Sequence, residues 1–566
     1  MITSREDAYW PETGQDQPLL DITLGQLLDR QALRHPERLA AVVVETGTAQ
    51  ATRWTYGELL ASVDRLARGL IAWGIEQGAH VAVMAPNLPE WLLLEFALAK
   101  VGAVLVTVNP AFHDRELEYL LKQGKISHLI FVPAYRKVDI AAMLAAMIPE
   151  VAGSGGQVSA AAYPHLRGLA VIGQEAAGLA LPFARLDDMA DSVTSETLAQ
   201  RQAAVRPRDV MQIQYTSGTT GRPKGAMLTH YGTVNNARLM GQRAGFREDD
   251  VLLSAMPFFH TAGCVCNVIG MMAAGGCLVA MDAFEPAAML NLWEEHAATV
   301  INAVPTMYSR MMHHPDFAAR RTGSLRIAFA GGTSIPPSLM RELNEQTGAE
   351  PMIIMGMTEC SPIITQTDPG DPFATRIATA GTPLPHTALR IADPETGKPC
   401  GWGEKGELCI RGYLVTRGYF DMADKTAETI DPEGWLHSGD LAVLEKTGHL
   451  RIVGRLKDMI IRGGENVFPV EIEDFLLDHP AIAQVQVVGI PDPDLGEEIF
   501  AFVLPARGAL ITPQEVQDHC RAHLARHKMP RHVRIVDHFP MTPNGKVQKF
   551  ALRKMAADLV RQGGSA

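Results

Sequence analysis

Short apolar runs alternate with longer amphipathic segments over the first part of the chain. HVAVMAP (80–86), LVTVNP (105–110) and HLIFVP (128–133) are short and apolar, as buried strands are. The segments that follow two of these runs have the spacing of helices. The first helix is expected after Asn87, which can cap it, with Pro89 in its first turn, and the second is DRELEYLLKQ (114–123). This alternation predicts mostly parallel sheets covered by helices.

One apolar segment, AGCVCNVIGMMAAGGCLVAM (262–281), is long enough to cross a bilayer. Asn267 and the pair Gly275-Gly276 interrupt it, so we interpret it as a buried helix followed by a short buried strand (278–281). Residues 150–205 are richer in Gly, Ala and Ser, and we interpret them as surface connections.

The pattern changes in the last third of the chain. GELCIRG (406–412) and HLRIVGR (449–455) predict antiparallel strands of a small β-rich unit. After Gly454 helical and strand patterns alternate again, which predicts a compact α+β terminal domain. These patterns are EIEDFLLDHP (471–480), VQVVGIPDP (485–493), IFAFVLP (499–505) and VQDHCRAHLARHK (516–528).

Length, charge and cysteine usage narrow the class of protein. At about 150 residues per domain, 566 residues correspond to three or four folding units. The net charge of −12 argues against a nucleic-acid partner, because phosphate backbones attract basic surfaces. Seven cysteines without a CxxC pair argue against a disulfide framework or a zinc site. The first residues, MITSREDAYWPETG, lack the basic and apolar regions of a secretory signal, so we expect a cytoplasmic protein without a transmembrane segment.

The strongest local signal is the signature loop, YTSGTTGRPKG (215–225), which follows a predicted strand and precedes a predicted helix beginning near Thr229. Its residue types suit a polyphosphate. The glycines allow close backbone approach, the hydroxyls donate hydrogen bonds, and Lys224 adds a compact positive charge. It is not a Walker A loop, because Lys224 is followed by Gly225 instead of Ser or Thr.

The signature loop resembles that of the adenylate-forming superfamily, which includes acyl- and aryl-CoA synthetases, and further family motifs follow in the same order to the C-terminus. The resemblance implies an α/β fold with a large N-terminal domain of parallel-rich αβ-layered sheets plus a small β-rich subdomain (1–454). It also implies a hinge (455–458) and a small mobile α+β C-terminal domain (459–566). Lys457 stands where the family places its hinge residue.

By this resemblance, the nucleotide site spans several motifs. MGMTE (355–359) resembles the adenine- and magnesium-binding segment, with Thr358 bonding a phosphate oxygen and Glu359 holding Mg²⁺. The family commonly has Tyr where this chain has Met355, so an aromatic stack on the adenine is replaced by a thioether. The expected ATP- and AMP-binding residues are Thr216, Ser217, Gly218, Thr219, Thr220, Gly221, Lys224, Gly331, Gly332, Met355, Gly356, Thr358, Asp440, Arg455 and Lys546.

The other implied roles concern ribose, the reacting groups and coenzyme A. Asp440 in HSGD (437–440) would accept both ribose hydroxyls, and Arg455 would reach ribose or phosphate. Lys546 in NGKVQK (544–549) is the expected catalytic lysine, together with Lys224, Thr358 and Glu359. Gly463 and Gly464 would border the pantetheine tunnel, and His260, Phe259 and Gly263 would line the acyl pocket.

The activity implied is that of an AMP-forming acyl-CoA synthetase. ATP and a carboxylic acid give acyl-AMP and pyrophosphate, and CoA then takes the acyl group. The segment 454–474, GRLKDMIIRGGENVFPVEIED, is similar to that of medium-chain fatty-acyl-CoA synthetases, which favours a short- or medium-chain fatty acid. An aryl acid, or a carrier-protein phosphopantetheine as acceptor, stays open. The implied cofactors and partners are ATP, Mg²⁺, coenzyme A and a small carboxylic acid, and the resemblance also allows a homodimer.

Overall fold

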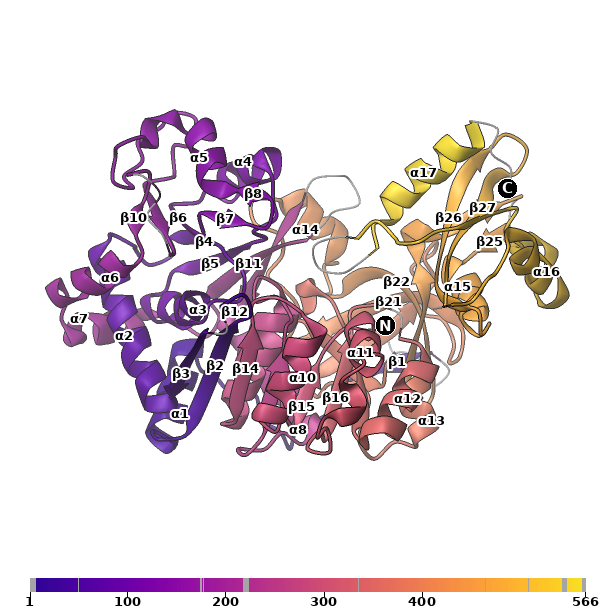
Figure 1. Cartoon of the computed structure of the whole chain (residues 1–566), viewed down its shortest axis with the longest axis horizontal. Coiled ribbons are helices and arrows are strands. Elements are labelled where there is room, and N and C mark those ends of the chain that lie inside the picture. Colours follow the sequence, from indigo (N-terminus) through magenta and orange to yellow (C-terminus); the bar gives the residue numbers. More distant parts are fainter. Residues whose placement is uncertain are drawn as a thin grey trace.

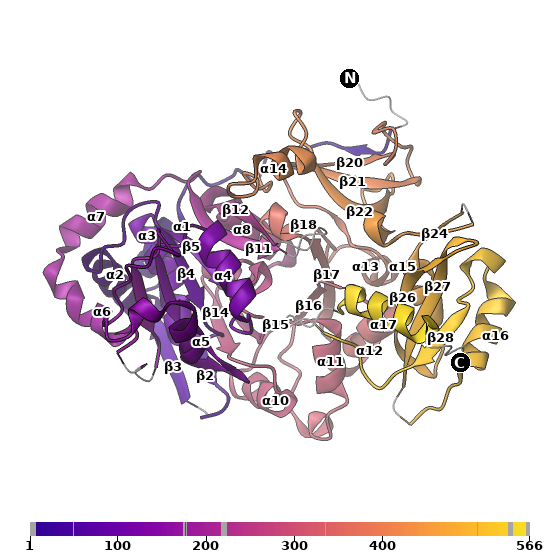
Figure 2. The ribbon, with the colours of Figure 1, turned by 90° about the horizontal axis from the view of Figure 1, so that it is seen from above.

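The computed structural model describes residues 7–48, 50–173, 176, 178–216, 223–333, 335–463, 465–506, 508–541 and 547–561. Two large sheets and their helices form the body of the molecule. The first large sheet lies toward one end of the long axis. A smaller antiparallel sheet and a separate C-terminal α+β domain lie toward the opposite end (Figure 1, Figure 2). The predicted α/β fold class, with its small terminal domain, is confirmed.

The first large sheet has seven strands in the order β10-β9-β6-β4-β5-β11-β12. All neighbours are parallel except the last pair, β11 and β12. The strands predicted near 80, 105 and 128 are β4, β5 and β6. The bounds are β4 His80–Met84, β5 Val104–Val108, β6 His128–Phe131, β9 Gly168–Val171, β10 Leu181–Pro182, β11 Val210–Thr216 and β12 Lys224–Thr229.

The predicted helix after β4 forms, but Asn87 does not cap it. Helix α3 (Pro89–Val101) begins after Leu88, and no side chain caps it. The Asn87 amide instead donates to the Met256 and Met281 carbonyls, at 3.0 and 2.9 Å, and its oxygen accepts from the Phe258 N–H. Asn87 therefore links the connection between β4 and α3 to β14 and to the segment after β13. Because these hydrogen bonds already engage its side chain, Asn87 does not cap the helix.

The second large sheet has nine strands in the order β19-β18-β17-β16-β15-β13-β14-β2-β3, and its central neighbours are parallel. The apolar segment 262–281 folds as predicted, as helical turns over Ala262–Ile269 and α9 (Gly270–Ala274) followed by the fully buried strand β14. The bounds are β2 Leu39–Glu45, β3 Gln50–Thr55, β13 Val251–Ser254, β14 Cys277–Met281, β15 Val300–Asn302, β16 Ile327–Gly331, β17 Glu350–Gly356, β18 Ile363–Gln366 and β19 Thr382–Pro383.

The helices that cover the two sheets begin at recognisable signals. In α2, for example, Thr55 and Glu58 form a capping box that satisfies two free N–H groups of the first turn. The helices of the body are α1 Leu24–Arg34, α2 Tyr56–Ala72, α4 Asp114–Gln123, α5 Ile140–Met147, α6 Ala184–Met189, α7 Ser195–Ala204, α8 His230–Ala244, α10 Pro286–Glu295, α11 Pro305–Met312, α12 Pro337–Thr347, α13 Phe373–Ala378 and α14 Ala423–Thr429.

The interpretation of residues 150–205 as surface connections is wrong in part. Strand β9 is buried within the first sheet, and Leu186 of α6 and Leu198 of α7 belong to the main core. Gly, Ala and Ser favour loops by composition, but Gly and Ala also pack closely inside a sheet. Among the described residues, no helix is both long and apolar enough to span a membrane.

The predicted β-rich unit is an antiparallel sheet in the order β1-β20-β21-β22-β23, and both predicted strands, β21 and β23, lie in it. Its strands are β1 Tyr9–Trp10, β20 Thr387–Ala392, β21 Lys405–Gly412, β22 Leu436–Leu444 and β23 Leu450–Arg455.

The C-terminal domain follows β23 and has its own apolar core, as predicted. Where it meets the antiparallel sheet, the Lys405 ammonium lies 3.5 Å from the centroid of the Phe468 ring. The domain contains β24 Ile460–Arg462, β25 Glu465–Val467, α15 Pro469–Leu477, β26 Ile482–Asp492, β27 Gly496–Pro505, α16 Pro513–His523, β28 His532–Ile535 and α17 Lys549–Arg561.

Candidate active site

The signature loop joins the last two strands of the first sheet. Thr216 ends β11, Lys224 begins β12, and the two residues are paired across the antiparallel ladder. The loop therefore connects the two strands of a β-hairpin. The sequence predicts a strand before the loop and a helix after it, but not β12, which includes the last two residues of the loop. The predicted residues Ser217, Gly218, Thr219, Thr220 and Gly221 lie outside the described residues.

Glu359 lies next to this hairpin. It belongs to a 3₁₀ turn, Thr358–Cys360, and its side chain is buried, with 6% of the residue exposed. Its Oε1 accepts a hydrogen bond from the Tyr419 hydroxyl at 2.8 Å and one from the Thr216 hydroxyl at 3.3 Å. Two elements far apart in the sequence thus hold one carboxylate at the end of β11.

Lys224 completes this arrangement. Its ammonium lies 4.2 Å from the centroid of the Tyr419 ring, within the range of a cation–π contact. Burial lowers the pKa of Lys224, while the charge of Glu359 opposes that shift. Burial and the adjacent Glu359 raise the pKa of Tyr419, so its hydroxyl keeps its proton and donates. We call Thr216, Lys224, Glu359 and Tyr419 the carboxylate cluster.

The structure shows why glycine stands at three of the predicted nucleotide positions. A Cβ on Gly331 would lie 2.7 Å from the Ile354 carbonyl oxygen, and one on Gly356 would lie 2.1 Å from the Pro362 carbonyl oxygen. Gly332 has open space around it but adopts φ +80°, which favours glycine. The first two glycines therefore let strands approach each other, and the third permits the turn after β16.

Met355 lies at the end of β17, where it pairs with Thr365 of β18. Its side chain is half-buried and packs against the core of the antiparallel sheet. Gly356, which follows it, is exposed, and Thr358 is half-buried like Met355. Because β16 and β17 are parallel neighbours, Gly331 and Met355, near their carboxyl ends, lie at the same edge of the second sheet.

Asp440 and Arg455 are cross-strand partners on β22 and β23. The Arg455 Nε donates to the Asp440 Oδ1 at 2.7 Å, and only 5% of Asp440 is exposed. Lys457 follows in the 3₁₀ turn Leu456–Asp458, where burial and the nearby Arg455 lower its pKa. Asp458 forms a 2.7 Å ion pair with Arg553 of α17, which ties this turn to the C-terminal domain.

The predicted acyl-pocket residues lie at the start of the helical turns that begin at Ala262. The rings of Phe259 and His260 are 5.1 Å apart, and the His260 carbonyl accepts from the Gly263 N–H. A Cβ on Gly263 would lie 2.1 Å from the Pro257 carbonyl oxygen, so glycine is required for this tight turn.

The Glu95 carboxyl also lies near this segment, and sequence reasoning did not single it out. Trp91 of α3 packs on Phe258 with ring centroids 5.3 Å apart, and Glu95 follows one turn later on the same helix. Glu95 is 1% exposed, and among the described residues neither of its oxygens has a hydrogen-bond partner. Burial raises the pKa of Glu95 well above its ordinary value, which favours the neutral form of the carboxyl. Its only sequence signal was a charge within an apolar helix.

The remaining predicted positions belong to the C-terminal domain. Gly463 adopts φ +61°, and its N–H donates to the Leu495 carbonyl at 2.7 Å. Gly464 and Lys546, the two residues expected to act in the separate half-reactions, lie outside the described residues. The structure therefore brings together Thr216, Lys224 and Glu359, and separately Asp440 and Arg455.

Comparison with known proteins agrees with this architecture. The ATP-bound structure of MatB from Rhodopseudomonas palustris matches with a TM-score of 0.80 and 29% identity, covering 95% of this chain and 100% of that one. The anthranilate CoA ligase AuaEII in complex with anthranoyl-AMP matches with a TM-score of 0.81 and 25% identity, covering 96% and 99%. The fold is that of adenylate-forming enzymes.

Sequence comparison is more specific. Residues 28–420 match the family model described as AMP-binding enzyme, and residues 471–546 match its C-terminal domain. YngI of Bacillus subtilis is 40% identical over 549 residues, which is 97% of this chain and 99% of the relative. The medium-chain acyl-CoA ligase ACSF2 of Danio rerio is 35% identical over 545 residues, 95% of this chain and 89% of the relative.

The chain belongs to the AMP-binding enzyme family. It is an AMP-forming acid–CoA ligase that uses ATP, CoA and a small carboxylic acid.

Proposed function

We propose that this enzyme activates a short- or medium-chain fatty acid, with the carboxylate cluster and the Asp440–Arg455 pair as the nucleotide site. The observation that carries the proposal is the convergence of Glu359 with Thr216 and Lys224, which lie toward the two ends of the signature loop. A buried carboxylate next to an ammonium group and hydroxyls suits a nucleotide phosphate with its counter-cation.

In the first half-reaction, an oxygen of the substrate carboxylate attacks the α-phosphorus of ATP. The bond from that phosphorus to the bridging oxygen breaks, so pyrophosphate leaves and acyl-AMP forms. Charge develops on phosphate oxygens, and fixed positive groups and donors stabilise it. We assign this role to Lys224, Thr358 and Lys546, while Asp440 and Arg455 hold the ribose.

The residues present fit Mg²⁺, which takes oxygen ligands and commonly one or two carboxylates. Both hydrogen bonds described for the Glu359 carboxylate end on Oε1, from Thr216 and Tyr419, so Oε2 is the oxygen we assign to the cation. When bound, Mg²⁺ would neutralise part of the phosphate charge.

In the second half-reaction, the CoA thiol attacks the acyl carbonyl and AMP leaves. A thiol is already a few per cent thiolate near neutral pH, so a strong base is not needed. We assign Gly463 and Gly464 to the pantetheine path and Lys457 to the hinge about which residues 459–566 rotate between the two half-reactions.

Relatives favour an aliphatic substrate, since ACSF2 carries the name medium-chain acyl-CoA ligase. The likeness to an anthranilate CoA ligase makes an aryl acid the second candidate. The segment expected to line the acyl pocket, MPFFHTAG (256–263), has no charged side chain apart from the titratable His260. This composition suits an apolar tail of either kind.

The first experiment is a panel of linear, branched and aryl acids with ATP and CoA, read as pyrophosphate release and thioester formation. The expected result is a maximum with linear acids of short or medium length. A maximum with aryl acids would replace the fatty-acid proposal. Pyrophosphate release without thioester formation for every acid would point to another acceptor than free CoA.

The second experiment separates the half-reactions. Lys546→Ala should abolish formation of acyl-adenylate, yet spare thioester formation from supplied acyl-adenylate. Gly464→Leu should do the reverse, keeping pyrophosphate exchange near that of the wild type. Each variant serves as the control for the other, and equal loss in both half-reactions would reject the assignment concerned.

A further inference from the structure

The loop that carries Asp440 is a bulge in the antiparallel sheet. Glu407 is paired with Leu441 and Cys409 with His437, so a single residue of β21, Leu408, faces the three residues 438–440 of β22. Such a bulge leaves backbone groups without ladder partners and re-aims the side chain it carries. Gly439, at its centre, adopts φ +70°.

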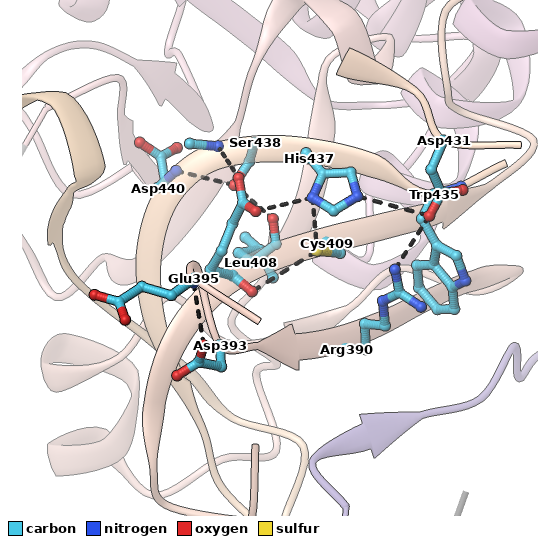
Figure 3. A network of polar contacts seen from close by, with 12 residues as sticks. Arg390, Asp393, Glu395, Leu408, Cys409, Asp431, Trp435, His437, Ser438 and Asp440 are labelled. Carbon is cyan, nitrogen blue, oxygen red and sulfur yellow. Dashed lines mark hydrogen bonds and ion pairs between the residues drawn. The ribbon is translucent and has the colours of Figure 1, made fainter. Parts of the chain in front are cut away.

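Side chains replace the missing ladder bonds. The Glu407 Oε1 accepts a hydrogen bond from the Gly439 N–H at 3.0 Å. The Ser438 hydroxyl donates to the Leu408 carbonyl at 2.6 Å and accepts from the Asp440 N–H at 3.1 Å (Figure 3). Two of the three bulge residues thus have their N–H groups bound by Glu407 and Ser438.

Glu407 is itself held from the other side. Its Oε2 accepts from the His437 Nδ1 at 2.8 Å, and the His437 Nε2 lies 3.6 Å from the Asp431 Oδ2. Arg390 donates to the same Asp431 oxygen at 3.2 Å (Figure 3). Contacts with the Cys409 sulfur and with the Glu407 carboxylate raise the pKa of His437 to about 10. The ring is therefore a cation at neutral pH. Its Nδ1 donates to Glu407, and its Nε2 forms an ion pair with Asp431.

Glu407, Cys409 and His437 are also residue types that bind metal ions, and their ligand atoms lie close together. Their hydrogen bonds already account for this geometry. Both Glu407 oxygens accept hydrogen bonds, and the His437 Nδ1 directs its proton to one of them.

We propose that Glu407 and Ser438 are positioning residues that fix the bulge 438–440 and thereby hold the Asp440 carboxylate in place for the ribose hydroxyls of ATP. The inference rests on the ribose role of Asp440 in the proposed function. Neither positioning residue is assigned a contact with the nucleotide. They act through the backbone on which Asp440 stands, while Arg455 binds its Oδ1.

The test is a thermodynamic cycle that combines a substitution in the protein with a change in the nucleotide. The coupling between the two changes isolates the interaction between the two altered groups. The KM for ATP and for 2′,3′-dideoxy-ATP is measured with the wild type, Glu407→Ala and Asp440→Asn. If Glu407 acts through the ribose contact, Glu407→Ala raises the KM for ATP about tenfold, the effect of losing about 1.4 kcal/mol. The KM for dideoxy-ATP, which lacks the contact, changes less than twofold, and kcat changes less than KM.

Two outcomes overturn the inference, and they are distinguishable. If Asp440→Asn discriminates between the nucleotides but Glu407→Ala raises both KM values equally, the positioning role falls while the ribose site stands. If Asp440→Asn also fails to discriminate, the ribose role of Asp440 falls, and the positioning role falls with it.

Two further variants distinguish a specific effect on the bulge from a general loss of folding. Ser438→Ala removes the other support of the bulge and should show the same nucleotide selectivity, about three- to fivefold, with a melting temperature near that of the wild type. The matched control is Glu404→Ala. Glu404 accepts a hydrogen bond from the Gly401 N–H at 2.7 Å in a turn of the same sheet. The Glu404→Ala variant therefore loses a comparable carboxylate–backbone hydrogen bond, but away from Asp440. Both KM values of this control should stay unchanged.

Discussion

The Tyr419 hydroxyl donates a 2.8 Å hydrogen bond to the Glu359 carboxylate across a sequence separation of 60 residues. The same ring lies under the Lys224 ammonium. One tyrosine therefore contacts both the carboxylate that we assign to the cation and the lysine that we assign to the phosphates. It orients both groups without a charge of its own.

Tyr419→Phe should keep the fold and the lysine contact but remove the hydrogen bond to Glu359. A hydrogen bond to a charged group contributes about 1.5 kcal/mol or more, so the rate of pyrophosphate release at limiting Mg²⁺ should fall about tenfold. The measurement is a Mg²⁺ titration of the first half-reaction. Saturating Mg²⁺ should restore most of the rate, and an unchanged titration would contradict the role of Tyr419.

Lys224 should give the first half-reaction an alkaline limit. Because burial lowers its pKa, the ammonium loses its proton at a pH below that of an ordinary lysine, and the rate falls there. Lys224→Arg keeps the charge to much higher pH and should move that limit upward, even if its maximal rate is lower. The pH profile of pyrophosphate release checks this, and an identical limit in both proteins would assign it to another group.

Glu95 should make the protein less stable as pH rises. Its pKa in the folded state is above its unfolded value, so its favourable contribution is complete below about pH 4.5 and is lost as pH rises toward the folded pKa. Glu95→Gln, which cannot ionise, should therefore become more stable relative to the wild type as pH rises above about 4.5. Thermal unfolding at several pH values measures the difference.

The control for that series is Glu345→Gln, on an exposed position of α12. Its effect should be small and independent of pH. A pH-independent effect of Glu95→Gln would contradict the raised pKa of Glu95 in the folded state.

Met355→Tyr should strengthen nucleotide binding. Met355 is half-buried at the edge where Gly331 and Gly356 also lie, and a tyrosine would add an aromatic face there. We expect the KM for ATP to fall about two- to fivefold without a comparable change in the KM for the acid. Met355→Leu, similar in volume but without a ring, is the control and should leave both unchanged.

Sequence reasoning predicted the alternation of β4, α3, β5, α4 and β6 because each element buries its own apolar pattern. It missed Tyr419, Glu95 and Glu407 for a common physical reason. The importance of each depends on a partner brought near by folding, such as Glu359 for Tyr419 or the Gly439 amide for Glu407. Nothing in the neighbouring residues of the chain records such a partner.

Asn87 shows the same limit in reverse. Its local sequence favours a helix cap, but three hydrogen bonds bind its side chain instead, one to Met281 of β14 and two to Met256 and Phe258 in the segment after β13. The composition of residues 150–205 likewise predicts surface connections, but their burial depends on the sheet that β9 joins.

The hairpin β11–β12 is bound to the chain around Tyr419 by its backbone as well. The Met227 N–H donates to the Gly418 carbonyl, and the Arg417 N–H donates back to the Met227 carbonyl. For anyone building chimeras from related ligases, the hairpin and residues 416–420 therefore form one cassette. Exchanging one segment alone would place hydrogen-bonded segments from different parents against each other, whereas exchanging both keeps them from the same parent.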